Sequence, residues 1–130
     1  MNPESPESAR AIFLATRRST LKLKRTQTIV CPPALYFGIL SKLADAKTAV
    51  GVQNVFYEPN GPFTGEFNAS MVVSAGGTHT IIGHSERREL GESLEAVNKK
   101  VLAALEQELT VVLCIGEKER ESQGNYLAFV

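Results

Sequence analysis

Residues 78–88 read THTIIGHSERR and carry, in order, an apolar run, a glycine and a group of polar and charged side chains. The run over 78–82 predicts a strand, and Gly83 ends it because glycine allows the chain to turn sharply. Ligands of parallel α/β folds bind beyond the carboxyl ends of the strands. His84, Ser85 and Glu86 follow this strand directly, so we expect them to lie in a functional site.

Along the rest of the chain, short apolar runs alternate with stretches in which apolar residues have helical spacing. This alternation predicts, in this order, a helix over 5–18, a strand over 28–31, a helix over 34–45, a strand over 49–52, a helix over 69–75, the strand over 78–82, a helix over 93–107, a strand over 110–115 and a helix from near 118. Such an order predicts parallel βαβ units, and uninterrupted apolar strands predict a sheet covered on both faces. The pattern indicates an α/β fold and leaves a doubly wound sheet and part of a barrel open.

Local signals indicate where helices begin and which side faces the core. Ser5 and Pro6 predict the start of the first helix, and Asn68 predicts the start of the helix over 69–75. The spacing predicts that the core faces contain Ala9, Ile12, Phe13 and Thr16 in the first helix, Leu35, Ile39 and Leu43 in 34–45, and Val97, Val101, Ala104 and Leu105 in 93–107.

The composition is typical of one soluble, globular domain. The chain has 130 residues, with 14 basic and 14 acidic side chains, and this balance excludes nucleic-acid binding by bulk positive charge. Its longest apolar runs span about five residues, against the roughly 18 of a membrane span, and its start shows no secretory signal. Two cysteines without CxxC spacing indicate reduced thiols in the cytosol and no metal site.

The residues after the strand over 78–82 have both functional and structural interpretations. At a helix N-terminus, His84 would be a neutral imidazole that donates an N–H to a carbonyl oxygen and shuttles protons. Glu86 is either a base or a solvated partner of an arginine. Taken alone, Arg87 and Arg88 indicate surface charges or partners in salt bridges.

Other candidates are weaker. We expect His79 to be structural and Cys114, within an apolar run, to be a buried and inert thiol. Glu117 is either an active-site or a loop carboxylate. The glycines of residues 61–66 suggest a phosphate cradle, but the Gly-Lys-Ser/Thr ending of a P-loop is missing.

Several motifs together resemble triosephosphate isomerase, and they occur in the same order along the chain. They are Gln53 with Asn54, GPFTGE over 61–66, Met71, GHSERR over 83–88 and CIGE over 114–117. CPP over 31–33 and NKKV over 98–101 agree as well. The resemblance covers essentially the whole chain and implies a TIM (β/α)8 barrel.

The resemblance implies interconversion of dihydroxyacetone phosphate and glyceraldehyde 3-phosphate through an enediol(ate), without a metal or organic cofactor. His84 would polarise the substrate carbonyl, Ser85 would belong to the same polar cluster, and Glu86 would pair with the active-site lysine. Arg87 would pair with nearby carboxylates, and Cys114 would lie behind the catalytic residues. The reaction would belong to glycolysis and gluconeogenesis and take place in the cytoplasm.

The resemblance also implies a homodimer. Thr64, in the loop over 61–66, would reach into the partner subunit and brace its active site. Gln53 and Glu92 would support the interface.

A barrel of this type takes about 250 residues and eight strands, whereas this chain resembles strands two to five. Met1 and Asn2 match the end of the family's first-strand motif Asn-x-Lys-Met-Asn, so the substrate-binding asparagine and lysine would precede Met1. The glutamate base of the sixth strand and the phosphate loops have no counterpart in residues 1–130. We expect one partial barrel domain, lacking the first and the sixth to eighth strands, with negligible activity alone and exposed sheet edges.

Two other functions remain open. A non-catalytic half-barrel would bind or complement a second half. A different barrel enzyme that acts on sugar phosphates would need another base, either Glu86 or Glu117.

Overall fold

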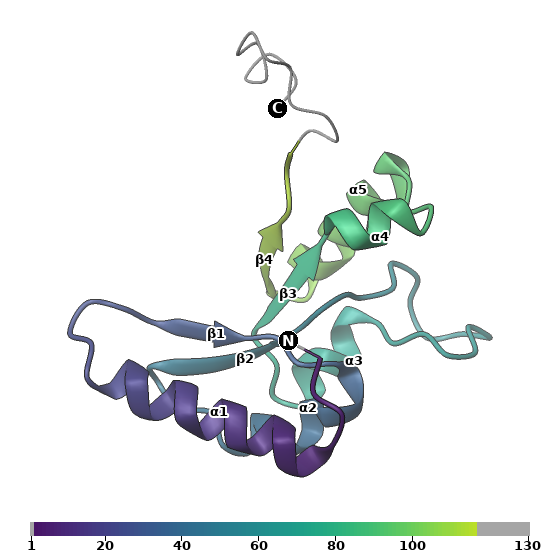
Figure 1. Cartoon of the computed structure of the whole chain (residues 1–130). Coiled ribbons are helices and arrows are strands. Elements are labelled where there is room, and N and C mark those ends of the chain that lie inside the picture. The colour runs from purple at the N-terminus through teal and green to yellow at the C-terminus, as the bar shows by residue number, and fades with distance from the viewer. Residues whose placement is uncertain (1, 117–130) are drawn as a thin grey trace, which may run out of the picture.

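The computed structural model describes residues 2–116, whose four strands form one parallel sheet (Figure 1). The strands are β1 (Thr28–Val30), β2 (Thr48–Val52), β3 (His79–Ile82) and β4 (Thr110–Leu113), and they are ordered β1-β2-β3-β4. Each strand therefore pairs with the next one along the chain. A doubly wound sheet reverses its strand order at a switch point, whereas a barrel adds strands in one direction. The described sheet follows the barrel order.

Five helices connect and cover these strands. They are α1 (Pro6–Leu21), α2 (Ala34–Ser41), α3 (Ala69–Ser74), α4 (Ser85–Glu89) and α5 (Leu94–Glu106). Helix α1 packs on α2 and β1, α2 packs on β2, and α5 packs on β3 and β4 (Figure 1). Across residues 2–116, none of the helices combines the length and the apolar character that a bilayer crossing requires. The helix expected from near 118, like Glu117, lies outside the described residues.

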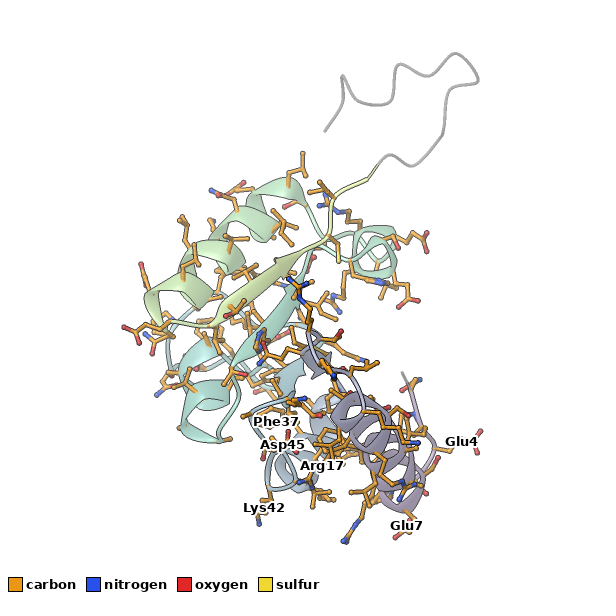
Figure 2. The ribbon with its side chains drawn as sticks, turned by 90° about the vertical axis from the view of Figure 1, so that its left-hand side faces the viewer. Glu4, Glu7, Arg17, Phe37, Lys42 and Asp45 are labelled. Atoms are coloured by element: carbon orange, nitrogen blue, oxygen red, sulfur yellow. The ribbon has the colours of Figure 1, made fainter. Side chains whose placement is uncertain are left out.

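The starts of α1 and α3 confirm the capping predictions. The Ser5 side chain accepts a hydrogen bond from the Ser8 N–H at 3.1 Å, and the Asn68 side chain accepts one from the Met71 N–H at 3.0 Å. Helix α1 places Phe13 in the core, but Ile12 is exposed, contrary to the prediction. Arg17 of α1 forms an ion pair with Asp45, which follows α2, and Figure 2 shows the two side chains together.

The predicted core face over 34–45 was wrong at Leu35 and Ile39, whereas Leu43, beyond the end of α2, packs against the core. The helix ends at Ser41 and buries Tyr36, Phe37 and Leu40, whereas Leu35 is 81% exposed and Ile39 is also exposed. The sequence ALYFGILS places apolar side chains on every side of the helix, so spacing alone does not select a face. Packing against α1 and β2 makes that selection.

The two faces of the sheet are covered unequally. In β3, Thr80 and Ile82 are buried on the helix side, while His79 and Ile81 on the opposite side are only half-buried. Ile29 of β1 and Val112 of β4 are exposed, and only β2 is buried along its whole length. The expectation of a sheet covered on both faces therefore holds for β2 alone, because the helices of the described region pack on one side.

Candidate functional site

The carboxyl ends of β3 and β4 border a hollow of about 470 Å³. Its walls come from the segment after β3 and the segment after β4, and its lining residues are Gly83, His84, Ser85, Arg88, Glu89, Cys114, Ile115 and Gly116. The sheet thus brings together two of the post-strand segments that the sequence identifies as candidates. This is the end of a parallel sheet at which ligands bind.

The backbone around His84 fixes the orientation of its imidazole. Gly83 turns the chain with a φ of +73°, and His84 then caps the N-terminus of α4. The Nδ1 atom accepts a hydrogen bond from the Glu86 N–H at 3.3 Å. Because an accepting Nδ1 carries no proton, a neutral His84 carries its proton on Nε2. The half-exposed ring therefore presents Nε2–H as its donor.

Ser85 and Glu86 follow His84 but are placed differently. Ser85 is exposed and lines the hollow. The Glu86 side chain is 83% exposed, is not among the lining residues, and places its Oε2 atom 3.7 Å from Nδ1 of His84. The hollow therefore brings His84 and Ser85 together, and the catalytic roles of all three residues stay predictions.

Arg88 forms an internal clamp, which corrects its interpretation as a surface charge. Its Nε atom donates to the carbonyl oxygen of Gly83 at 2.7 Å, and its Nη2 atom donates to that of Cys114 at 3.1 Å. One side chain on α4 therefore ties together the ends of β3 and β4. The sequence marks Arg88 as a candidate but contains no signal for these acceptors, because both are backbone carbonyls of separate segments.

A second buried polar cluster, which the sequence pattern does not predict, lies behind α4. Lys100 of α5 is only 4% exposed; its Nζ atom pairs with Oε1 of Glu92 and donates to Oδ1 of Asn54 at 2.8 Å. The Nε atom of Arg87 lies 3.6 Å from the same Glu92 oxygen, as expected for an arginine among carboxylates. The available signal was the position of Lys100, three residues after the core residue Val97.

The three residues expected at a subunit interface have different surroundings. Thr64 is exposed in the loop between β2 and α3. Gln53 is half-buried and donates from Nε2 to the carbonyl oxygen of Cys31 at 3.2 Å. Glu92 is buried within the polar cluster. Their roles toward a partner subunit stay predictions.

The cysteines and His79 complete the set of candidate residues. Burial raises the pKa of the Cys31 thiol to about 11. Cys114 is half-buried and lines the hollow, so it is less enclosed than expected. Burial lowers the pKa of His79, whose Nδ1 shares a hydrogen bond of 2.7 Å with the Thr78 hydroxyl. Within residues 2–116, no three His, Cys, Asp or Glu side chains gather as a metal site would require.

Comparison with known proteins places this site in context. The family model described as triosephosphate isomerase matches residues 1–130. A triosephosphate isomerase of Coprinopsis cinerea is 41% identical over 124 residues, which are 93% of this chain and 49% of that protein. One from Aspergillus oryzae is 45% identical over 121 residues, which are 89% of this chain and 48% of that protein. The chain thus spans about half the length of these curated relatives.

A solved structure agrees with the sequence matches. The crystal structure of triosephosphate isomerase from Bartonella henselae superposes with a TM-score of 0.66 and 36% sequence identity. The match covers 70% of this chain and 39% of that one.

Proposed function

Because the chain belongs to the triosephosphate isomerase family, we propose that it supplies the carbonyl-polarising part of an active site that interconverts dihydroxyacetone phosphate and glyceraldehyde 3-phosphate. The described residues form about half of a TIM barrel, with four parallel strands in barrel order. In this proposal His84 is the electrophile, and the reaction passes through an enediol(ate) without a metal or organic cofactor.

The geometry of His84 is the observation that carries this proposal. Its Nδ1 atom accepts the Glu86 N–H, so Nε2–H is the donor that can polarise a carbonyl oxygen in the hollow. A neutral imidazole beside a glutamate base is the arrangement already described for this family. Ser85 lines the same hollow and adds a hydroxyl group to it. Glu86, exposed beside His84, is available to pair with a lysine from another part of the barrel.

Residues 1–130 alone would have negligible isomerase activity. They contain no counterpart of the family's sixth-strand glutamate, first-strand lysine or phosphate loops. General base catalysis typically contributes about 10²–10⁴-fold to a rate, and correct positioning contributes more. Turnover therefore requires these groups from additional chain.

A chimeric enzyme tests the proposal. Residues 1–130 replace the matching segment of the Coprinopsis cinerea relative, and isomerase activity is measured by a coupled assay. We expect the chimera to turn over substrate, and His84→Gln to reduce kcat at least about a hundredfold. His79→Gln is the matched control, because His79 does not line the hollow. A folded chimera in which His84→Gln keeps full activity would contradict the role of His84.

The uncovered sheet face favours a second candidate function, a half-barrel that complements a second half without catalysis. Ile29 and Val112 expose apolar side chains on that face, and covering them would be favourable. An active chimera that depends on His84 supports the enzyme. A well-folded but inactive chimera supports the non-catalytic candidate. A different sugar-phosphate enzyme that uses Glu86 as its base is less well supported, because Glu86 does not line the hollow.

We further propose a cytoplasmic homodimer that serves glycolysis and gluconeogenesis. Thr64 is presented on an exposed loop, where it could reach a partner subunit. Gln53 and Glu92 are more enclosed, so they would support an interface from below its surface. Sedimentation of the chimera with Thr64→Arg tests the dimer, because an arginine at a packed contact would favour the monomer.

A further inference from the structure

Lys100 occupies an unusual position for a lysine. It lies on the core side of α5 between Val97 and Ala104, both of which are buried. Burial of an ammonium group is costly unless it is paired and hydrogen-bonded. Lys100 meets that condition with Oε1 of Glu92, in the turn between α4 and α5, and with Oδ1 of Asn54, just after β2. A single side chain therefore joins three segments.

Glu92 connects this lysine to the far end of the helix that carries His84. The Glu92 N–H donates to the carbonyl oxygen of Arg87 at 3.0 Å, and Arg87 Nε lies 3.6 Å from Glu92 Oε1. Arg87 in turn donates its own N–H to the carbonyl oxygen of His84 at 2.9 Å. Helix α4 has only five residues, so a displacement of its C-terminal end also reorients its first turn. That turn contains the Glu86 N–H, which holds Nδ1 of His84.

We propose that Lys100 is a positioning residue for His84: through Glu92 it anchors the C-terminal end of α4 and so keeps the Glu86 N–H directed at Nδ1. Arg88, in the same last turn of α4, binds the Gly83 and Cys114 carbonyl groups through its side chain. The two contacts tie α4 to different segments, because Glu92 lies in the turn before α5 and the acceptors of Arg88 follow β3 and β4. The value of this arrangement for catalysis rests on the proposed function, whereas the positioning itself does not.

The test uses the full 130-residue chain and requires no turnover. In a His79→Gln background, His84 is the only histidine, so its ring nitrogens give unambiguous ¹⁵N signals. The first measurement is the solvent exchange of the Glu86 amide. The second is the tautomer of His84 near pH 8.5, about two pH units above the ordinary histidine pKa. Failure of the isomerase proposal would change neither readout.

Three variants separate positioning from general stability. Lys100→Met removes the anchor and leaves the buried Glu92 carboxylate with Arg87, 3.6 Å away, as its remaining cation, so it threatens folding. The double variant Lys100→Met with Glu92→Leu removes both charges, and apolar replacement of a buried pair is often tolerated. Lys99→Met is the matched control, because Lys99 is the neighbouring lysine on the same helix and pairs with Glu95 at the surface.

We expect the double variant to fold and to exchange its Glu86 amide at least tenfold faster than the parent, with α5 amides unchanged. The Nδ1–H tautomer of His84 becomes detectable, and Lys99→Met changes neither readout. A folded double variant with the parent's Glu86 exchange and tautomer overturns the proposal. A double variant that does not fold also overturns it, because the pair would then support the whole fold rather than α4.

Discussion

The Nη2 atom of Arg88 donates to the carbonyl oxygen of Cys114 at 3.1 Å, across 26 residues of sequence. Its Nε atom donates at the same time to the carbonyl oxygen of Gly83 at 2.7 Å. The planar guanidinium has donors in a fixed arrangement, so one side chain can bind two carbonyl groups that face it from neighbouring strands. The walls of the candidate site are therefore held by a residue of its own helix.

Substitution of Arg88 tests this clamp. Arg88→Lys keeps the positive charge but loses the fixed arrangement of donors. We expect the free energy of unfolding to fall by about 1.5–3 kcal/mol, the contribution of hydrogen bonds to charged groups. Urea unfolding gives the measurement, with Arg18→Lys at an exposed position of α1 as the control. Equal urea midpoints for Arg88→Lys and Arg18→Lys would contradict a stabilising role of the two Arg88 hydrogen bonds.

The orientation of α2 is tested by two leucines of the same helix. Leu40 is fully buried, whereas Leu35 is 81% exposed. We expect Leu40→Ala to lower the free energy of unfolding by about 2–5 kcal/mol, because it leaves a cavity. Leu35→Ala should change it by no more than about 0.5 kcal/mol. Chemical unfolding measures the free energy of unfolding of both variants. A larger loss of stability in Leu35→Ala than in Leu40→Ala would support the core face that spacing predicts.

The turn before His84 is tested by two glycines. Gly83 and Gly91 have φ angles of +73° and +95°, a region that costs other residues about 1–2 kcal/mol. A Cβ atom on Gly83 would lie 2.9 Å from Nη2 of Arg88 and 3.3 Å from a methyl carbon of Val97, whereas one on Gly91 would meet open space. We expect Gly83→Ala to be more destabilising than Gly91→Ala in thermal unfolding. Equal losses of thermal stability in the two variants would mean that the Arg88 side chain moves away from the added methyl group without an energetic penalty.

The Cys31 thiol is expected to react slowly. Burial raises its pKa from 9.0 to about 11, so at pH 8 its thiolate fraction is about a hundredfold lower than that of an unperturbed thiol. In a Cys114→Ser background, alkylation of the folded chain should be slower by about that factor than alkylation in urea. Similar rates in both conditions would show that the thiol is accessible and unperturbed.

The same pKa shift has a consequence for stability. The folded state keeps the Cys31 proton to higher pH than the unfolded chain does, so it binds more protons between pH 9.0 and about 11. This contribution to stability is complete below pH 9.0 and is lost as the pH rises toward about 11. Comparison of the chain with Cys31→Ala over that range isolates the effect. A parallel decline in both proteins would contradict it.

Much of the local structure was predictable because it depends on neighbouring residues. The capping by Ser5 and Asn68 involves partners three residues away, and both caps were confirmed. The turn at Gly83 follows from the conformational freedom of glycine. Apart from α4, for which spacing predicts no helix, the described order of strands and helices also follows from local spacing. The motifs around His84 indicated the family, which the family match confirmed.

Only the tertiary structure decided which sides of these elements are buried and which distant groups meet. Leu35 and Leu40 are both leucines of α2, and packing against α1 and β2 buries one and exposes the other. Lys100 and Arg88 resemble surface cations in the sequence, but their partners come from separate segments. A sequence pattern gives the type of each residue and of its neighbours along the chain. The contacts of a buried charge depend on which segments the folded sheet brings together.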